Sequence, residues 1–371
     1  MRILDDDRQL LADSLRALLS SRSGPAAVRS AIASPNGYDA SLWAILCDQI
    51  GVGGISIPDE YGGAGGGTVE AVVVAEELGR VLAPSPALGS GLAAALLLAT
   101  DDENAKGSLL PAIASGRTIV AVCVANARAI WDAETAVEAR DDRGWLLTGT
   151  AHHVLDAAVA EVFVVLARTP DGLGWFLVSA STGVTCTGGS AMDPTRALHR
   201  VRFDDAPARR IDVVDPRAAL TSTIDTGMIL LAGEQAGAAA RCLELTVAYT
   251  KSRVQFGRPI GSFQALKHRM ADLLVLVRTA RALAYAAANS DERNRHTDAT
   301  VARIHCSEAF ETVAAECVQL HGGIAITWEH DMQLYFKRAH SSAHLFGTPR
   351  QLVRSLDEAA GVASHGAVSP T

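Results

Sequence analysis

The sequence predicts an α+β fold in three consecutive parts: an N-terminal helical domain over residues 1–115, a middle antiparallel β-domain over 116–215, and a C-terminal four-helix bundle over 216–371. Two observations predict this order. Apolar residues recur at helical spacing in the first and last parts, whereas short β-branched or aromatic runs separated by turn residues occupy the middle. A chain of 371 residues with 49% hydrophobic content also has enough material for two or three buried cores.

The N-terminal part begins with an apolar stripe at helical spacing, formed by Leu10, Leu11, Leu15, Leu18 and Leu19. The patterns further predict helices over residues 41–50, 67–81 and 87–99. The glycine-rich segment Pro58-Asp-Glu-Tyr-Gly-Gly-Ala-Gly65 predicts a loop between them, because glycine relaxes the limits on the backbone.

The middle part contains five short runs typical of strands, over residues 119–124, 135–140, 145–148, 162–166 and 175–178. Turn residues at 141–144 and 169–172 separate consecutive runs, as in β-hairpins. The β-domain is expected to end near residues 203–207, beyond which Ala, Gly and Leu dominate.

Four long helical patterns follow from Thr223 onward. Gly322 and Gly323 are expected to end one of them, since glycine suits a left-handed C-terminal cap. The final helix should begin at Thr348-Pro349, with a capping box that involves Gln351.

Bulk properties exclude several classes of protein. A net charge of −8 and a pI near 5.8 argue against nucleic acid as a partner. The start of the chain lacks the pattern of a secretory signal, and the most apolar stretch, residues 92–99, is far shorter than the ~20 residues of a membrane span. We therefore expect a cytoplasmic protein that does not bind membranes. Six scattered cysteines indicate reduced, mostly buried thiols, and His340 with His344 indicates a helix face rather than a metal site.

Four motifs carry a resemblance to a known family. The segment Arg253-Val-Gln-Phe-Gly-Arg-Pro-Ile260, followed by Ser262-Phe263-Gln264, resembles a signature of the acyl-CoA dehydrogenases. The block Gln319-Leu-His-Gly-Gly323 and the pair Gly347-Thr348 lie where that family has them, and residues 58–65 resemble its P-x-x-Y-G-G-x-G turn. The three-part order predicted above is also that of the family.

The resemblance implies FAD as the cofactor. The residues that it implies in FAD binding are Arg253, Phe256, Gln264, Gln319, Gly322, Gly323 and Thr348. In similar proteins the Arg, the Phe, the two Gln and the Gly-Gly pair reach the adenosine-diphosphate half of a cofactor held mainly by the neighbouring subunit. Arg253 suits phosphate because its planar guanidinium donates paired hydrogen bonds, and Phe256 is expected on the same face of a helix end. Gln319 has an alternative role as a cap of local backbone.

The positions that hold the flavin ring within one chain differ from the family. Relatives have Trp-Ile-Thr on a strand, where the indole packs on the flavin and the Thr hydroxyl bonds its N5 edge. This chain has His153-Val154-Leu155 there. The usual Thr-Glu-Pro-x-x-Gly-Ser segment upstream is replaced by residues 125–128, Ala-Asn-Ala-Arg.

The catalytic base is also missing from both positions at which relatives carry it. Oxidation of an acyl-CoA across Cα and Cβ needs a carboxylate to take the α-proton while hydride leaves Cβ for the flavin. Phe346 and Gly227 occupy the two positions, and neither can accept a proton. Asp225 and Glu234 are weak substitutes: Asp225 is offset by about 200° around the helix and Glu234 lies ~10 Å further along it.

Three interpretations remain open. The first is the non-catalytic subunit of a heteromeric α2β2 acyl-CoA dehydrogenase, paired with a homologous subunit that carries the catalytic Glu and acting on a bulky thioester such as a steroid side chain. The second is a self-sufficient homotetramer that uses Asp225 or Glu234. The third is a binding or scaffold protein that has kept the fold and lost redox chemistry.

Overall fold

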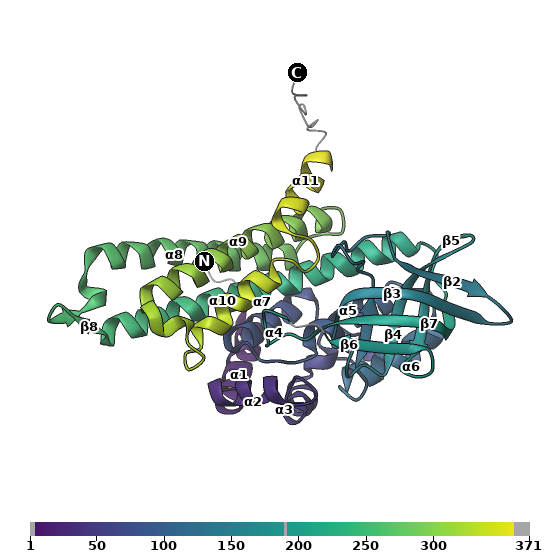
Figure 1. Cartoon of the computed structure of the whole chain (residues 1–371), viewed down its shortest axis with the longest axis horizontal. Coiled ribbons are helices and arrows are strands. Elements are labelled where there is room, and N and C mark those ends of the chain that lie inside the picture. The colour runs from purple at the N-terminus through teal and green to yellow at the C-terminus, as the bar shows by residue number, and fades with distance from the viewer. Residues whose placement is uncertain (1–3, 189–190, 360–371) are drawn as a thin grey trace, which may run out of the picture.

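The computed structural model describes residues 4–188 and 191–359, which form N-terminal helices, a β-sheet and a bundle of long helices (Figure 1). The N-terminal helices are α1 (Asp6–Arg22), α2 (Pro25–Ala33), α3 (Ala40–Ile45), α4 (Thr68–Val81), α5 (Ala87–Leu98) and α6 (Glu103–Ala114). In α1 the predicted stripe buries Leu15 and Leu19, whereas Leu10 is 67% exposed. Asp5 caps α1 by accepting a hydrogen bond from the backbone N–H of Arg8.

The sheet comprises β1 (Val120–Cys123), β2 (Val137–Asp141), β3 (Trp145–Leu155), β4 (Val162–Thr169), β5 (Gly172–Ser179), β6 (Val184–Gly188) and β7 (Leu198–Ile211). The strand order is β1-β4-β2-β3-β7-β5, β6 pairs with β7, and β5 also pairs with β4, so the pairings close into a ring. Most pairs are antiparallel as predicted, but β4 runs parallel to both β1 and β2. Parallel pairing arises because the loop between β1 and β2, residues 124–136, crosses to the other end of the sheet.

Strand β3 is interrupted by a bulge between Ala151 and Val154. His153 lies within the bulge with a left-handed φ of 53°, and the backbone N–H of His152 donates to Ala125 O at 2.9 Å rather than to a neighbouring strand of the ladder. Bulges re-aim side chains along a strand. The bulge therefore decides which way the last residues of β3 point.

The long helices are α7 (Pro216–Ser252), α8 (Gln264–Ala288), α9 (Arg295–His321) and α10 (Met332–Ser342), followed by α11 (Pro349–Ala359). The fold class predicted from the sequence is confirmed, including the four-helix C-terminal region. Gly322 ends α9 with φ 70°, and Thr348 and Gln351 form the predicted capping box of α11. The domain boundaries at 115/116 and 215/216 stay predictions.

Helices α4 and α7 cross with their backbones in contact. A Cβ on Gly79 would overlap the carbonyl oxygen of Glu234, and a Cβ on Gly237 would overlap that of Glu76. The Glu76 carboxylate then bridges α4 to α8, since it accepts hydrogen bonds from Arg281 and the Tyr285 hydroxyl. This crossing fixes α7, which carries the candidate site, against the N-terminal helices.

Among the described residues, no helix combines the length and apolar character that a membrane span requires. The six cysteines are unpaired, and Cys186 alone among them is exposed.

Candidate functional site

The two positions at which a base was expected lie against each other. A Cβ built on Gly227 of α7 would lie 3.0 Å from Phe346 Cζ, 3.1 Å from Phe346 Cε2 and 2.8 Å from Leu92 Cδ2. Phe346 is 2% exposed, so its ring fills the space that the missing side chain of Gly227 leaves. Neither residue has a side-chain oxygen or nitrogen that could accept a proton.

Trp131 completes this packing from the other side. Its ring centroid is 4.9 Å from that of Phe346, at an interplanar angle of 66°, which is a favourable edge-to-face arrangement. The indole N–H is buried without a hydrogen-bond partner among the described residues. We call Trp131, Phe346, Gly227 and Leu92 the aromatic plug.

A compact loop presents Trp131 to the plug. Asn126 organises the loop, because its Oδ1 accepts from the backbone N–H groups of Arg128 and Ile130 and its Nδ2 donates to Glu134 O. This loop includes the residues that replace the family's Thr-Glu-Pro-x-x-Gly-Ser segment. The sequence predicted the loss of a flavin contact here but not the gain of an aromatic ring.

A buried arginine holds the turn that carries Phe346. Arg303 of α9 is fully buried, and its Nη2 donates to Ser342 O at 2.6 Å and to Leu345 O at 2.7 Å. Burial lowers the pKa of Arg303 to about 10. Phe346 itself has φ 58°, a conformation that costs a non-glycine residue about 1–2 kcal/mol. The two carbonyl contacts therefore help to hold a strained residue in the plug.

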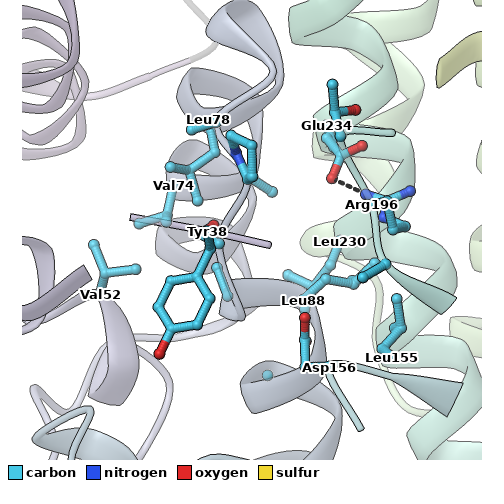
Figure 2. A pocket seen from close by; sticks show the side chains of 18 of the residues that line it. Tyr38, Val52, Val74, Leu78, Leu88, Leu155, Asp156, Arg196, Leu230 and Glu234 are labelled. Carbon is cyan, nitrogen blue, oxygen red and sulfur yellow. Dashed lines mark hydrogen bonds and ion pairs between the residues drawn. The ribbon is translucent and has the colours of Figure 1, made fainter. Parts of the chain in front are cut away.

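Glu234 lies on α7 with both carboxylate oxygens in ion pairs, and Figure 2 shows the one with Arg196. Oε2 accepts from Arg196, and Oε1 accepts from Arg338 Nη1 at 2.8 Å. Burial alone would raise the pKa of Glu234, but the two guanidinium groups hold it below its usual value. Such a carboxylate is a poor proton acceptor, which disfavours Glu234 as a substitute base.

Asp225, the other weak substitute, is buried and engaged with a histidine. His296 Nδ1 of α9 lies 2.7 Å from Asp225 Oδ1, and this hydrogen bond raises the pKa of His296. The side chain of His296 is 58% exposed. No sequence pattern pointed to His296, because the two residues lie on different helices, 71 positions apart.

The flavin-ring positions on β3 retain little that suits a flavin. His153 replaces the expected indole, and burial together with the nearby His344 lowers its pKa, so the ring is neutral near pH 7. Leu155 is 5% exposed and has no hydroxyl for a flavin N5. These two positions therefore lack both the broad aromatic surface and the hydroxyl donor that the family uses.

Most of the positions predicted to bind the nucleotide are exposed at one end of the long helices. Arg253 caps the C-terminus of α7 and forms no ion pair with any described residue. Phe256 was expected on a helix end, but it lies in the turn of a hairpin formed by β8 (Val254–Gln255) and β9 (Arg258–Pro259). Phe256 has φ 51° and Gly257 has φ 74°, and two left-handed residues in a two-residue loop suit the twist of a hairpin. The Phe256 ring is 91% exposed.

Contacts between aromatic rings bring most of the predicted cofactor residues together. Tyr249, one turn before Arg253, stacks on His321 at 4.5 Å between ring centroids, and Gly322 and Gly323 follow directly. Phe263 precedes Gln264 at the start of α8 and contacts the Phe256 ring edge-on at 6.2 Å. Gln264, Gln319, Gly322 and Gly323 are all exposed. Thr348 follows Phe346 by two residues and caps α11. Helix α11 lies apart from the β8–β9 hairpin (Figure 1).

The exposed residues predicted to bind the cofactor differ in character from the buried base position. The chain exposes an arginine, an aromatic ring and amide groups that suit a nucleotide bound from outside, but it fills its own base position with apolar atoms. The exposed group matches what a neighbouring subunit's cofactor would need.

Comparisons with known proteins identify the family. The acyl-CoA dehydrogenase N-terminal domain matches residues 5–117, and the acyl-CoA dehydrogenase C-terminal domain matches residues 217–359. Acyl-CoA dehydrogenase IpdE2 of Mycobacterium tuberculosis is 45% identical over 95% of this chain and 96% of its own length. The IpdE2 of Mycolicibacterium smegmatis is 42% identical over 95% of this chain and 99% of its own length.

Two solved structures are similar over nearly the whole chain. A chain of the ChsE4-ChsE5 complex from Mycobacterium tuberculosis has a TM-score of 0.88 and 26% identity, covering 99% of this chain and 100% of that one. A chain of the Tcur3481-Tcur3483 steroid ACAD, G363A variant, has a TM-score of 0.87 and 29% identity, covering 97% and 99%. With its sequence motifs, its fold and these relatives in agreement, the chain belongs to the acyl-CoA dehydrogenase family.

Proposed function

We propose that this chain is the non-catalytic subunit of a heteromeric, α2β2 acyl-CoA dehydrogenase. A homologous subunit with an intact glutamate supplies the base and the flavin cradle. This chain supplies the groups that hold the adenosine-diphosphate half of its partner's FAD. The substrate is an acyl-CoA thioester, and the two-chain steroid enzyme among the relatives favours a bulky acyl group.

The observation that carries the proposal is the contact between Phe346 and Gly227. A carboxylate at either position would enter apolar packing made by Leu92, Trp131 and the other position. An unpaired charge in such surroundings is expensive. Of the two substitutes considered, Glu234 is bound to two arginines and Asp225 is hydrogen-bonded to His296. Neither the usual base positions nor these two residues therefore offer a carboxylate well suited to remove the α-proton.

The exposed residues support cofactor binding across an interface. Arg253 would hold the pyrophosphate, Phe256 would cover an aromatic or ribityl part, and Gln264 and Gln319 would offer amide donors and acceptors. When bound, FAD accepts the hydride that leaves Cβ of the thioester. In this chain's own flavin-ring position, His153 and Leu155 provide no equivalent cradle, so one FAD per pair of subunits is expected.

The direct experiment is co-expression with the acyl-CoA dehydrogenase homologue encoded nearest to this chain in its genome. We expect the two chains to co-purify with one flavin per pair and to reduce an artificial dye with an acyl-CoA. The chain purified alone should bind little flavin and show no turnover. Full flavin occupancy and turnover from the isolated chain would contradict the proposal and favour the self-sufficient homotetramer.

Variants of this chain test its contribution to the partner's site. Arg253→Ala and Phe256→Ala should each lower the flavin content and the dye-reduction rate of the co-purified complex. The matched control is Arg293→Ala, since Arg293 is also an exposed arginine but lies between α8 and α9. If the control and the Arg253 variant lose flavin equally, Arg253 has no specific role.

A further inference from the structure

A cavity of about 290 Å³ lies between α1, α2, the end of α4, α7 and the start of α10. No residue of the aromatic plug and none of the residues predicted to bind FAD lines it. A water molecule takes about 30 Å³ in the liquid, so the cavity has room for a molecule of about ten non-hydrogen atoms. Its presence has no part in the function proposed above.

The inner wall of this cavity is apolar. Leu19 of α1, Val28 of α2 and Leu334 of α10 line it, and all three are buried. Leu82 and Leu245 extend the apolar surface at the end of α4 and on α7. Apolar walls of this kind provide most of the contact with a small molecule, while a few polar groups decide its orientation and selectivity.

One buried polar side chain on this wall has no partner. Ser23 follows α1 directly, is 4% exposed, and its hydroxyl forms no hydrogen bond with any described residue. Buried polar groups are nearly always paired. The Ser23 hydroxyl therefore calls for a hydrogen-bonding group inside the cavity.

The N-terminus of α2 adds hydrogen-bond donors next to Ser23. Gly24 is the N-cap residue and has no side chain to cap the helix, and Pro25 occupies the first helical position. The backbone N–H groups of Ala26 and Ala27 consequently lack a partner among the described residues. Gly24 and Pro25 both line the cavity. Free N–H groups and the helix dipole at such a terminus favour a negatively charged group.

Both carboxylates that line the cavity are already paired with arginines. Glu77, which is 2% exposed, accepts hydrogen bonds from Arg16. Asp331 accepts a hydrogen bond from Arg29 at 2.6 Å. Neither carboxylate therefore leaves an uncompensated negative charge that would repel an anion.

A further arginine on the cavity wall is only weakly compensated. Arg80 Nη2 donates to the Glu244 carboxylate at 2.7 and 2.9 Å, whereas Arg241 Nη1 reaches the same carboxylate at 3.2 Å. Two guanidinium groups on one carboxylate leave one positive charge in excess. Arg241 lines the cavity, and its side chain is 41% exposed, so it can meet an anion at the rim.

We propose that this cavity binds an amphipathic monocarboxylate, a carboxylate on a short apolar chain. The carboxylate accepts hydrogen bonds from the Ser23 hydroxyl and the free N–H groups of α2, and Arg241 supplies the opposite charge. The apolar chain lies against Leu19, Val28 and Leu334.

Octanoate is the probe, and isothermal titration calorimetry with the full-length chain measures its dissociation constant. Ser23→Ala removes the unpaired hydroxyl, and Arg241→Gln removes the excess charge while keeping a long polar side chain. We expect each variant to weaken octanoate binding about three- to tenfold, as loss of one hydrogen bond to an anion does.

Each of these variants has a matched control. Ser21→Ala removes a hydroxyl that is two residues away and already donates to Leu18 O. Arg278→Gln removes an exposed arginine of α8 that does not line the cavity. Neither control should change octanoate binding.

Octan-1-ol separates the charge from the chain, because it has the same apolar chain without a carboxylate. It should bind the unchanged protein more weakly than octanoate does, and Arg241→Gln should not weaken it further. Val28→Trp fills the cavity and should abolish binding of both probes. If circular dichroism shows that this variant does not fold, Ser23→Ala and Arg241→Gln decide the test.

Three results would overturn the proposal. The first is octanoate binding that is equal in the unchanged, Ser23→Ala and Arg241→Gln chains. The second is octanoate binding that survives in a folded Val28→Trp chain, which would place the probe elsewhere. The third is displacement of octanoate by inorganic phosphate at equal concentration, which would show that the site takes any anion and does not select the apolar chain.

Discussion

At the scale of single residues, Phe346 combines a strained backbone conformation with a buried ring. Removing the ring should therefore lower the stability of the chain. Phe346→Ala would remove the ring that contacts Gly227, Leu92 and Trp131. We expect the free energy of unfolding to fall by about 3–5 kcal/mol, the usual cost of emptying a buried aromatic position. Denaturant titration of the isolated chain measures it.

The same substitution at Phe256 is the control for that prediction. Phe256 is 91% exposed in the isolated chain, so Phe256→Ala should change the free energy of unfolding by less than about 0.5 kcal/mol. Equal losses from the two variants would mean that the plug does not pack as the structure describes.

Glu234 offers a second residue-scale prediction. Glu234→Gln removes the carboxylate paired with Arg196 and one of the two paired with Arg338 in a buried network, and we expect a loss of about 3–5 kcal/mol in unfolding free energy. Glu138→Gln breaks an exposed ion pair with Arg168 and should cost no more than about 1 kcal/mol. A comparably small effect at Glu234 would reopen its role as a free carboxylate.

His296 gives a pH-dependent prediction. Its hydrogen bond to Asp225 raises its pKa in the folded chain above the unfolded value near 6.5. The folded state therefore binds the proton more tightly, and the stability contributed by this pair is complete below pH 6.5 and disappears as the pH rises through the folded pKa.

His296→Gln should accordingly destabilise the chain more at pH 5.5 than at pH 9. The difference is expected to be small, because the side chain is 58% exposed. Thermal melts of both chains across this pH range check it, with His268→Gln, an exposed histidine of α8, as the control. An effect that grows with pH would have the wrong sign for this interaction.

At the scale of elements, the crossing of α4 and α7 depends on two glycines. Gly237→Ala would push a methyl group into the carbonyl of Glu76, and overpacking of this kind typically costs about 1–3 kcal/mol. Gly107→Ala in α6 is the matched control, because no atom lies within 4 Å of its built Cβ. That change should stabilise the chain by about 0.5–1 kcal/mol, since alanine favours helix. Denaturant midpoints of the two variants should therefore move in opposite directions.

Elements with periodic apolar residues or a recognisable cap could be predicted from the sequence. Elements without either signal could not. The caps of α9 and α11 follow from glycine and from a Thr-Pro pair. Helix α6 contains Gly107 and Pro111, which obscure its periodicity. Strand β6 is almost entirely exposed, so it lacks the alternation that marks a half-buried strand. The β8–β9 hairpin was missed because Phe256 is an unusual residue for a left-handed turn position.

The same limit applies to the candidate site. The absence of a base at Phe346 and Gly227 could be seen in the sequence, since it concerns residue identity at motif positions. What replaces it could not be seen. Trp131 and Arg303 reach their partners through tertiary contacts with distant segments, and local sequence patterns carry no information on such contacts.

At the scale of the whole molecule, the proposed function predicts how FAD affects stability. A ligand that binds only the native assembly at 100 times its dissociation constant stabilises it by about 2.7 kcal/mol. We expect added FAD to raise the melting temperature of the two-chain complex and to leave that of the isolated chain unchanged. If FAD and acyl-CoA stabilise neither the chain nor any complex with a homologue, the scaffold interpretation is favoured instead.

The aromatic plug has a consequence for the history of this chain. A glutamate introduced at residue 346 alone would meet Leu92, Trp131 and the backbone of Gly227, and the nearby Arg303 already donates to Ser342 O and Leu345 O. Regaining proton abstraction would demand several coordinated replacements, each harmful to folding before the others arrive. Under the proposed function, such packing makes the loss of the base difficult to reverse, and the chain would be retained through its contribution to a partner subunit.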